Sequence, residues 1–462
     1  MRFFPTLGPL LILLSWLQVS PAQDRERLGW EEVFAEMKPF SGPSVPGVDT
    51  STLHGKVVTG YQGWFGTPED GYSRGWVHYG RQGRFSPSRL TIDYWPHTEE
   101  MDPEALARTR FVKADGSPAY AFSSAHPDVA MTHFRWMKEY GIEAAFLQRF
   151  ATNVRWPSGM RRNNRVLDNV RAAANAHGRA YVVMYDLSSL PRGGTAEVKK
   201  DWKRLVDHMQ LTRDPKDQAY LSHKGKPLIA LWGVGFHPDE GKRNYTLEET
   251  ADLIRFFRDD ADYGNLSIML GVPTGWRTLD RDADPSSQVH DLIRMADVVS
   301  PWTPGRYRSI EEAEQHAQHS WLPDLAWCQQ EGLDYLPVVF PGFSWGNLYP
   351  GEEFNAIPRQ GGHFLWAQYR LLINGGCRMI YQAMFDEIDE GTQILKVDAH
   401  PPVAPGLTLL SYDPLPDDHY LWLVGQAQDY LASKKPAPLE LPRREGHLYP
   451  EKKEAAYKEA GR

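Results

Sequence analysis

The stretch DVAMTHFRWMKEYGIEAAFLQRF, residues 128–150, decides the fold. In its first half an apolar residue recurs every three positions between Met131 and Tyr140, which predicts a helix that stops at Gly141. Its second half, residues 143–150, is a nearly continuous apolar run, typical of a parallel strand buried on both faces. A helix that leads directly into a buried strand is the repeating unit of an α/β fold.

The same alternation continues on both sides of this unit. Eight short β-like runs are expected at residues 57–65, 143–150, 180–187, 227–233, 267–273, 298–303, 335–342 and 379–386. Segments with helical spacing lie between them, at residues 128–140, 166–177, 196–211, 247–263, 288–297, 310–330 and 361–373. Eight strands alternating with helices predict an α/β protein with a single (β/α)8 TIM barrel. The alternative is an open, doubly wound sheet, but the strand count and the lack of a Gly-rich phosphate loop after the first strand favour the barrel.

Two segments depart from the regular pattern. Residues 66–127 form a long loop after the first expected strand, and a loop of that length in a compact domain is usually functional. We expect it to lie over the C-terminal end of the barrel, where TIM-barrel active sites are found. After the eighth strand, residues 397–425 are expected to form a final helix or a short C-terminal extension.

The first 22 residues of the 462 have the pattern of a signal peptide. A positive charge at Arg2 precedes an apolar stretch, residues 7–19, that is too short to span a bilayer comfortably, and small residues precede an expected cut before Gln23. An uncleaved N-terminal anchor is the alternative. We therefore expect a secreted or periplasmic protein with no membrane span after signal removal. The remaining divisions are a lead-in at 23–54, the (β/α)8 domain at 55–425 and a charged, solvated C-terminal tail at 426–462.

The composition excludes several classes of protein. Hydrophobic residues make up 41% and charged residues 24%, which is typical of a globular protein, and a net charge of -8 argues against a nucleic-acid partner. Only two cysteines are present and no CxxC or HExxH motif occurs, so no metal and no organic cofactor is implied. The 16 Trp, 21 Tyr and 19 Phe are an aromatic surplus of the kind that lines sugar-binding clefts, although a large aromatic core is the alternative.

The eighth expected strand ends in a cluster of carboxylates. Asp386, Glu387, Asp389 and Glu390 place four carboxyl groups in five positions at the C-terminal end of the barrel. Like charges this close raise the pKa of at least one member, which yields a proton donor beside an ionised neighbour. Glycoside hydrolysis needs that division between two carboxyl groups. A solvated acidic turn or a Ca²⁺ site is the alternative.

The same segment carries a family resemblance. FDEIDEGTQI, residues 385–394, resembles the Phe-Asn-Glu-Trp-His-Glu-Gly-Thr-Gln-Ile segment of glycoside hydrolase family 99, which contains endo-α-1,2-mannosidases and mannanases. YQGWFG at 61–66 is similar to the family's Tyr-x-Pro-Trp-Tyr-Gly first strand, and WVHY at 76–79 is similar to its Trp-x-His-Trp. A Pro-Gly-Phe at 341–343 resembles its Pro-Gly-Tyr loop, and the similarity runs from about residue 55 to 425.

The resemblance implies a (β/α)8 barrel and roles for two glutamates. Glu387 would help the sugar 2-hydroxyl attack its own anomeric carbon, and Glu390 would protonate the leaving oxygen, so that configuration is retained. Ile388 and Asp389 replace the family's Trp and His, and Asp386 replaces its Asn. These changes keep the acid/base pair but alter its surroundings, so the resemblance does not fix which sugar is the substrate.

Substrate contacts are expected from polar and aromatic residues, most of them at or just past the strand ends. Packing in the core is the alternative for Tyr61 and the tryptophans. The alternative for His78, in the long loop, is a loop-stabilising hydrogen bond, and for Tyr307 it is a surface salt bridge. Asp186 is included because the resemblance matches it to a family glutamate at a strand end that contacts substrate. The candidates are Tyr61, Trp64, His78, Asp186, Trp232, Trp276, Trp302, Tyr307 and Trp345. The glutamate pair, these candidates and the signal-peptide pattern predict a secreted glycoside hydrolase. The family resemblance implies that it retains configuration and cleaves within an α-linked, α-mannan-like polysaccharide or glycan. The alternatives are an α-1,3-glucanase-type or other glycan hydrolase and a non-catalytic carbohydrate-binding barrel.

Overall fold

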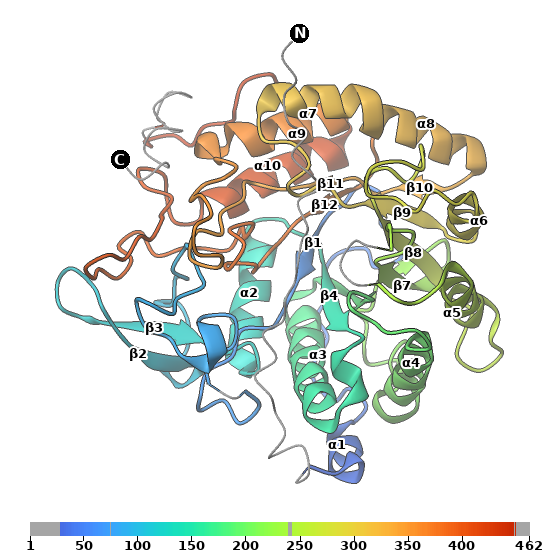
Figure 1. The fold of residues 1–462 in the computed structure, drawn as a ribbon, viewed down its shortest axis with the longest axis horizontal. Coiled ribbons are helices and arrows are strands. Elements are labelled where there is room, and N and C mark those ends of the chain that lie inside the picture. Colours follow the sequence, from blue (N-terminus) through green and yellow to red (C-terminus); the bar gives the residue numbers. More distant parts are fainter. Residues whose placement is uncertain (1–27, 74, 239–242, 448, 450–462) are drawn as a thin grey trace.

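The computed structural model describes residues 28–73, 75–238, 243–447 and 449, and its centre is a parallel β-barrel (Figure 1). The strands are β1 (Val57–Tyr61), β4 (Ala144–Phe150), β5 (Ala180–Asp186), β7 (Lys226–Trp232), β8 (Ser267–Val272), β9 (Val298–Pro301), β10 (Asp334–Tyr335), β11 (Val338–Val339) and β12 (Ile380–Gln382). β1, β4, β5, β8, β9 and β12 are buried at every position, as expected for strands covered on both faces.

The barrel closes through a strand that is divided in two. The strands follow the order β10-β9-β8-β7-β5-β4-β1-β12-β11, so the two ends of the order are β10 and β11. Only Leu336 and Pro337 separate these two in the chain. The Leu336 amide donates to Val299 on β9, and the Pro337 carbonyl accepts from Tyr381 on β12, both at 2.9 Å. β10 and β11 are therefore halves of the expected seventh strand, interrupted at a proline that has no N–H to donate. The predicted TIM barrel is confirmed.

Helices surround the barrel (Figure 1). They are α2 (Pro127–Glu139), α3 (Pro157–His177), α4 (Thr195–Met209), α5 (Leu247–Asp259), α6 (Gln288–Ile293), α7 (Ile310–His316), α8 (Leu322–Glu331), α9 (His363–Asn374) and α10 (His419–Ser433). A π-helical turn, Ala317–Trp321, joins α7 to α8 within the segment expected at 310–330. Helix α3 begins nine residues before the expected start at 166, because Pro157 suits a first helical position and the first turns are polar.

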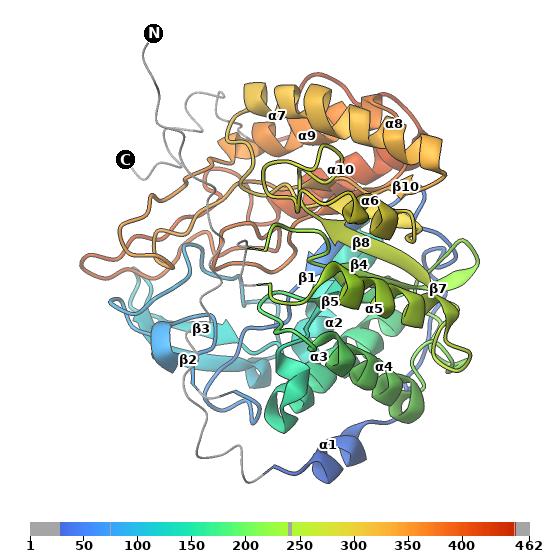
Figure 2. The same cartoon turned by 45° about the vertical axis from the view of Figure 1, so that its right-hand side comes forward.

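The long loop after β1 is more ordered than its sequence suggests. It contains a hairpin, β2 (Leu106–Val112) with β3 (Pro118–Phe122), which lies on the side of the molecule away from α5 and α6 in both views (Figures 1 and 2). Bridges from Tyr94 to Leu410 and from Pro96 to Val397 fasten the loop to the segment after β12. The two insertions thus hold each other at the C-terminal end of the barrel.

The expected boundary after residue 425 differs from the structure. Helix α10 runs through it, and Val424, Ala427 and Leu431 on the two sides of the boundary are buried together. Beyond the helix, Leu441 is also buried, and the Trp366 indole donates to the Pro438 carbonyl at 3.0 Å. The chain up to about residue 447 therefore packs on the barrel, because its apolar residues keep a helical spacing across 425.

Two other sequence-based expectations concern residues that the structure does not describe, in whole or in part. The expected signal peptide, residues 1–22, and the tail residues 448 and 450–462 lie outside the described residues. Within the described ranges, no helix is long and apolar enough to cross a membrane. A short helix, α1 (Trp30–Glu36), precedes the barrel, β6 (Ser222–His223) pairs with the start of β7, and the lead-in pairs with the end of α3 through Val45 and Val48.

Candidate active site

The acidic segment after β12 is buried rather than solvated. The exposed fractions of Asp386, Glu387, Asp389 and Glu390 are 0%, 4%, 3% and 8%. The segment folds back on itself, and the Thr392 amide donates to the Glu387 carbonyl at 3.2 Å. A solvated acidic turn is thereby excluded. Burying four carboxyl groups together disfavours their charged forms, so their protons and partners decide what the site can do.

Asp386 fixes the backbone of the site. Its two carboxylate oxygens accept the backbone N–H groups of Gln62 at 2.7 Å and Gly63 at 2.9 Å. This joins the end of β1 to the loop after β12. Burial raises the pKa of Asp386 to about 7, although the two amide hydrogen bonds oppose that shift. Asp386 therefore acts on the geometry of its neighbours.

The two candidate catalytic glutamates have unequal surroundings. The Glu387 carboxylate accepts hydrogen bonds from Gln62 Nε2 and from Thr392 Oγ1, both at 2.6 Å. Among the described residues, no side chain or amide donates to the Glu390 carboxylate. Burial raises the pKa of both glutamates, and the charges of Glu387 and Asp389 add to the effect at Glu390. Hydrogen bonds to a carboxylate favour its ionised form, so a proton shared by the pair resides on Glu390.

Asp389 connects the pair to the long loop. Its Oδ2 lies 2.7 Å from His78 Nδ1, while its Oδ1 is buried and accepts no hydrogen bond from the described residues. The His78 ring stacks on Trp64, with centroids 4.0 Å apart, and Trp64 stacks in turn on Phe150 at 5.7 Å. Trp64 thus stacks with two rings of the protein and supports the position of His78.

Four other predicted residues lie at strand ends with small accessible areas. Asp186 ends β5, and burial raises the pKa of its carboxyl group, which accepts the Ser188 amide at 2.7 Å. Trp232 at the end of β7 and Trp302 after β9 form a perpendicular pair with centroids 5.6 Å apart. Trp345 follows β11 and is 6% exposed. These positions are compatible with the expected substrate contacts.

Three predicted substrate contacts lie in the core instead. Tyr61, Trp276 and Tyr307 are at most 2% exposed. The Tyr61 hydroxyl lies 2.9 Å from a histidine nitrogen, that of Tyr307 donates to a glutamine at 2.7 Å, and the Trp276 indole donates to an aspartate at 3.2 Å. Each polar atom is satisfied inside the protein, so these three rings pack the barrel and do not line a cleft.

Gln62 and Thr392, which donate to Glu387, were not predicted from the sequence. Both lie inside the motifs quoted for the family resemblance, at 61–66 and 385–394, so their positions were visible. Their partner was not, because Gln62 and Glu387 are 325 residues apart in the chain. Nor did the sequence pair His78 with Asp389, which are 311 residues apart.

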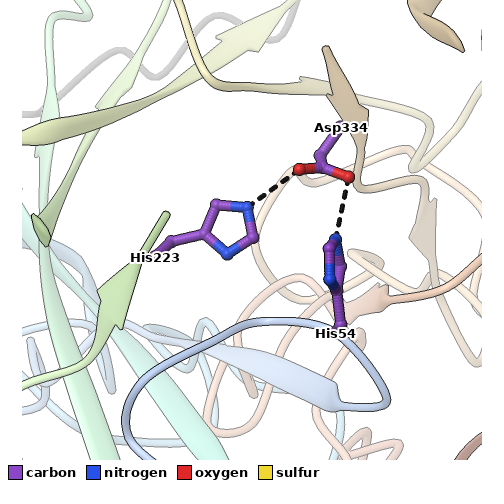
Figure 3. A group of neighbouring side chains, drawn as sticks. All are labelled: His54, His223 and Asp334. Carbon is purple, nitrogen blue, oxygen red and sulfur yellow. Dashed lines mark hydrogen bonds and ion pairs between the residues drawn. The ribbon is translucent and has the colours of Figure 1, made fainter. Parts of the chain in front are cut away.

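A second cluster, drawn in Figure 3, lies where β1, β7 and β10 begin, at the opposite end of the barrel. Among the described residues, His54, His223 and Asp334 form one group whose potential metal-binding atoms all lie within 4.8 Å of one another. The nitrogens that face Asp334 are His54 Nε2 at 2.8 Å and His223 Nε2 at 3.0 Å. The other ring nitrogens accept hydrogen bonds, from Arg378 at 3.0 Å and from the Leu53 amide at 3.2 Å.

These hydrogen bonds fix the tautomers of both rings. A nitrogen that accepts from a guanidinium or an amide carries no proton, so in each neutral ring the proton is on Nε2 and is donated to Asp334. Neither Nε2 then has a lone pair for a metal ion. The cluster is a hydrogen-bonded clamp that joins the lead-in and β6 to the start of β10.

Comparisons with known proteins agree with the fold. No protein-family model matches the chain, and no curated protein matches its sequence. A family 99 endo-α-mannosidase from Bacteroides thetaiotaomicron, solved in complex with BIS-TRIS propane, matches with a TM-score of 0.58 and 15% identity over 83% of this chain and 98% of that one. A structure of the family 99 endo-α-mannosidase from the same organism gives a TM-score of 0.58 and 15% identity over 83% and 99%. A glycoside hydrolase-like protein matches with a TM-score of 0.50 and 14% identity over 84% and 97%. At these identities the likeness shows a shared fold over nearly the whole length of each neighbour.

Proposed function

We propose that this protein is a retaining glycoside hydrolase that cleaves within an α-linked glycan, with Glu387 as the base and Glu390 as the acid. The observation that carries the proposal is the unequal pair. Glu387 accepts two hydrogen bonds that favour its carboxylate, whereas Glu390 is buried beside it without such donors. One proton shared in this way yields an acid and a base at the same pH. The shared fold with endo-α-mannosidases supports the same reading.

The reaction we propose proceeds in two steps. Glu387 removes the proton of the sugar 2-hydroxyl, whose oxygen attacks its own anomeric carbon while Glu390 protonates the departing glycosidic oxygen. The bond to the leaving sugar breaks and a 1,2-anhydro sugar forms. Water then attacks the anomeric carbon, Glu390 accepts the proton of the water, and Glu387 returns its proton to the 2-oxygen. Two inversions at the same carbon give net retention.

We expect Asp389 to influence which sugar the site binds. In this chain it replaces the histidine of the family motif and holds His78, a residue of the long loop. The group beside the pair is therefore an aspartate–histidine couple that is fixed by stacking on Trp64. We propose an α-mannan-like glycan as the first substrate class to test, because its 2-hydroxyl is trans to the glycosidic oxygen, as the attack requires. The second class to test is α-1,3-glucan, whose 2-hydroxyl is cis to that oxygen, so that its cleavage would exclude attack by the 2-hydroxyl.

The test is the release of reducing ends from purified protein on α-mannans, α-glucans and acidic polysaccharides. Glu390→Gln should lower turnover about 10²- to 10⁴-fold and leave glycan binding intact, because the amide cannot donate an acidic proton. Glu387→Gln should also lose turnover. The matched control is Glu143→Gln, since Glu143 pairs with Lys56 at the N-terminal end of the barrel. Full activity in Glu390→Gln would remove that residue from the acid role.

Two further readouts separate the mechanism from a binding function. The first product observed by proton NMR should have the α configuration, and a substrate that lacks the 2-hydroxyl should resist cleavage. Binding to one glycan without cleavage of any would support the carbohydrate-binding barrel instead. We also propose export, on the pattern of residues 1–22; N-terminal sequencing of the exported protein should begin at Gln23.

A further inference from the structure

A cavity lined by both polar and apolar side chains lies next to Gln62 and His78, which contact Glu387 and Asp389. Its volume is about 240 Å³, which is several times the space of about 30 Å³ that one water occupies in the liquid. Gln62 and His78 line it on the side of the glutamates, and the end of β4 and the first turns of α3 line the rest. Since Gln62 Nε2 also donates to Glu387, one side chain connects the cavity to the reacting groups.

The cavity contains buried cationic donors without acceptors. Arg149 is 2% exposed, and three of its hydrogen bonds go to Asp201 and Asn164, but Nη1 has no partner among the described residues. Arg162 donates from Nη2 to the carbonyls of Trp64 and Phe65. Its Nε is buried and has no hydrogen-bond partner among the residues that the structure describes. A buried donor left unsatisfied costs about 1–3 kcal/mol, so an acceptor placed in the cavity would gain hydrogen bonds that these two groups otherwise lack.

Only one of these two guanidinium groups forms an ion pair. Arg149 is neutralised by Asp201, but Arg162 has no carboxylate within ion-pair distance in the described ranges. Asp70 is the carboxylate that acts on Arg162 from nearby, and its own oxygens are already held by Ser123 and three backbone amides. The Arg162 guanidinium therefore lines the cavity without an ion pair of its own among the described residues.

The start of helix α3 adds to the positive potential. Ser158 and Gly159, the second and third residues of this 21-residue helix, line the cavity. The side chain of the N-cap residue, Trp156, makes no capping hydrogen bond, and the first turn contains no acidic residue. The N-terminus of a helix carries about half a positive charge and attracts oxyanions. The donors and the helix end thus point to the same kind of occupant.

We infer that this cavity is a subsite for an oxyanion substituent of the glycan, namely a sulfate ester, a phosphate or a uronate carboxylate. The inference rests on the proposed function for the identity of the substrate, but not for the anion site itself. The free guanidinium N–H groups of Arg149 and Arg162 would hold the oxyanion. The edges of Trp64 and Phe150, which also line the cavity, would contact the sugar ring that carries it.

The first experiment measures anion binding without any glycan cleavage. Inorganic sulfate, inorganic phosphate and glucuronate are each titrated into the purified protein by calorimetry, at constant ionic strength set with NaCl. The anion that fits should bind the native protein and bind Arg162→Gln about tenfold or more weakly. Arg161→Gln is the matched control, because Arg161 precedes Arg162 on the same helix and pairs with Glu36 outside the cavity. The three titrations separate the tetrahedral anions from the carboxylate.

A second variant covers the case in which Arg162→Gln fails to fold. Ser158→Asp places a carboxylate at the helix start, where it favours the helix but repels an anion in the cavity. This variant should keep or raise the melting temperature and should lose anion affinity. Equal affinity in the native protein, Arg162→Gln and Ser158→Asp, or no binding of any of the three anions, would overturn the inference and leave a water-filled cavity.

The second experiment compares a sulfated α-glycan with its chemically desulfated form as substrates. The sulfated form should be cleaved with the higher kcat/KM, and Arg162→Gln should remove that preference. Cleavage of both forms at equal rates in all variants would overturn the subsite and keep the proposed function. Anion binding that depends on Arg162, together with no cleavage of any glycan, would instead overturn the proposed function and keep the anion site.

Discussion

The two ends of the barrel hold carboxyl groups in opposite states. At the N-terminal end, burial of Asp334 is outweighed by hydrogen bonds from His223 and His54 and by the charge of Lys224, which together lower the pKa of Asp334 below its usual range (Figure 3). At the C-terminal end, burial and the charges of Glu387 and Asp389 raise the pKa of Glu390. The same chemical group is thus fully partnered at one end and under-partnered at the other.

This difference separates stability from function. A carboxylate surrounded by donors joins distant segments, and Asp334 connects the lead-in, β6 and β10. A carboxyl group without donors destabilises the native state but remains available to a substrate. In TIM barrels the N-terminal end is usually structural and the C-terminal end catalytic, and the proposed function places catalysis at the C-terminal end of this barrel.

The largest expected effect breaks the N-terminal end of the comparison. Asp334→Ala leaves two imidazole N–H groups and Lys224 without their acceptor, so the free energy of unfolding at pH 7 should fall by about 3 kcal/mol. Turnover measured below the unfolding temperature should be unchanged. Asp291→Ala is the control, because Asp291 is exposed on α6, and it should change stability by less than about 0.5 kcal/mol. If Asp334→Ala lowered the free energy of unfolding no more than Asp291→Ala does, the cluster would contribute no stability.

The second prediction concerns pH and the C-terminal end. A carboxyl group with a raised pKa binds its proton more tightly in the native state, so its contribution to stability falls as pH rises from its unfolded pKa to its folded pKa. Glu390→Gln removes this term. The variant should therefore gain stability relative to the native protein by up to about 1.4 kcal/mol per pH unit above about pH 4.5. Urea unfolding at pH 5 and pH 8 measures the gain.

The third prediction sharpens the assignment of acid and base. Gln62→Leu removes a hydrogen bond that favours ionised Glu387, so the pKa of Glu387 should rise. The acid limb of the kcat/KM profile should move up by about one pH unit, which is about tenfold in rate at pH values below it. The alkaline limb, which reports Glu390, should stay in place. Movement of the alkaline limb alone would reverse the two roles.

The smallest expected effect concerns metal at the His54, His223 and Asp334 cluster. Both ring nitrogens that face Asp334 carry protons, so neither offers a lone pair that could bind Zn²⁺. Addition of stoichiometric Zn²⁺, or dialysis against a chelator, should change the melting temperature by less than about 1 °C, within the range of an exposed surface mutation. Stabilisation by several degrees would show that the cluster binds metal and that the tautomer assignment is wrong.

Much of the fold was predictable because it rests on local patterns. Buried strands and amphipathic helices keep their spacing along the chain, so the first strand, the helix–strand segment at 128–150 and its six counterparts were found in order. The boundary after 425 failed for a related reason: charged residues farther along suggested a tail, while Leu431 and Leu441 are in fact buried. The charged composition of residues 426–462 predicted a solvated tail, but the packing of its apolar residues places the described part of it on the barrel.

The site was predictable only in part. The acidic cluster was visible because its members are neighbours in the sequence. Tyr61, Trp276 and Tyr307 were assigned to substrate because they stand at or near strand ends, yet each ring turns into the core where a polar partner receives it. Sequence spacing places a residue along a strand but does not tell which of its neighbours satisfies its polar atom.

The sequence by itself determined the barrel and the position of the acid cluster, because periodicity and contiguity are properties of the chain. Only the tertiary structure decided which glutamate keeps the proton. Gln62 reaches Glu387 across 325 residues, and no donor reaches Glu390 from the described part of the chain. A pKa is set by burial and by hydrogen bonds in three dimensions, so the chemistry of a carboxylate appears only when the chain brings its partners together.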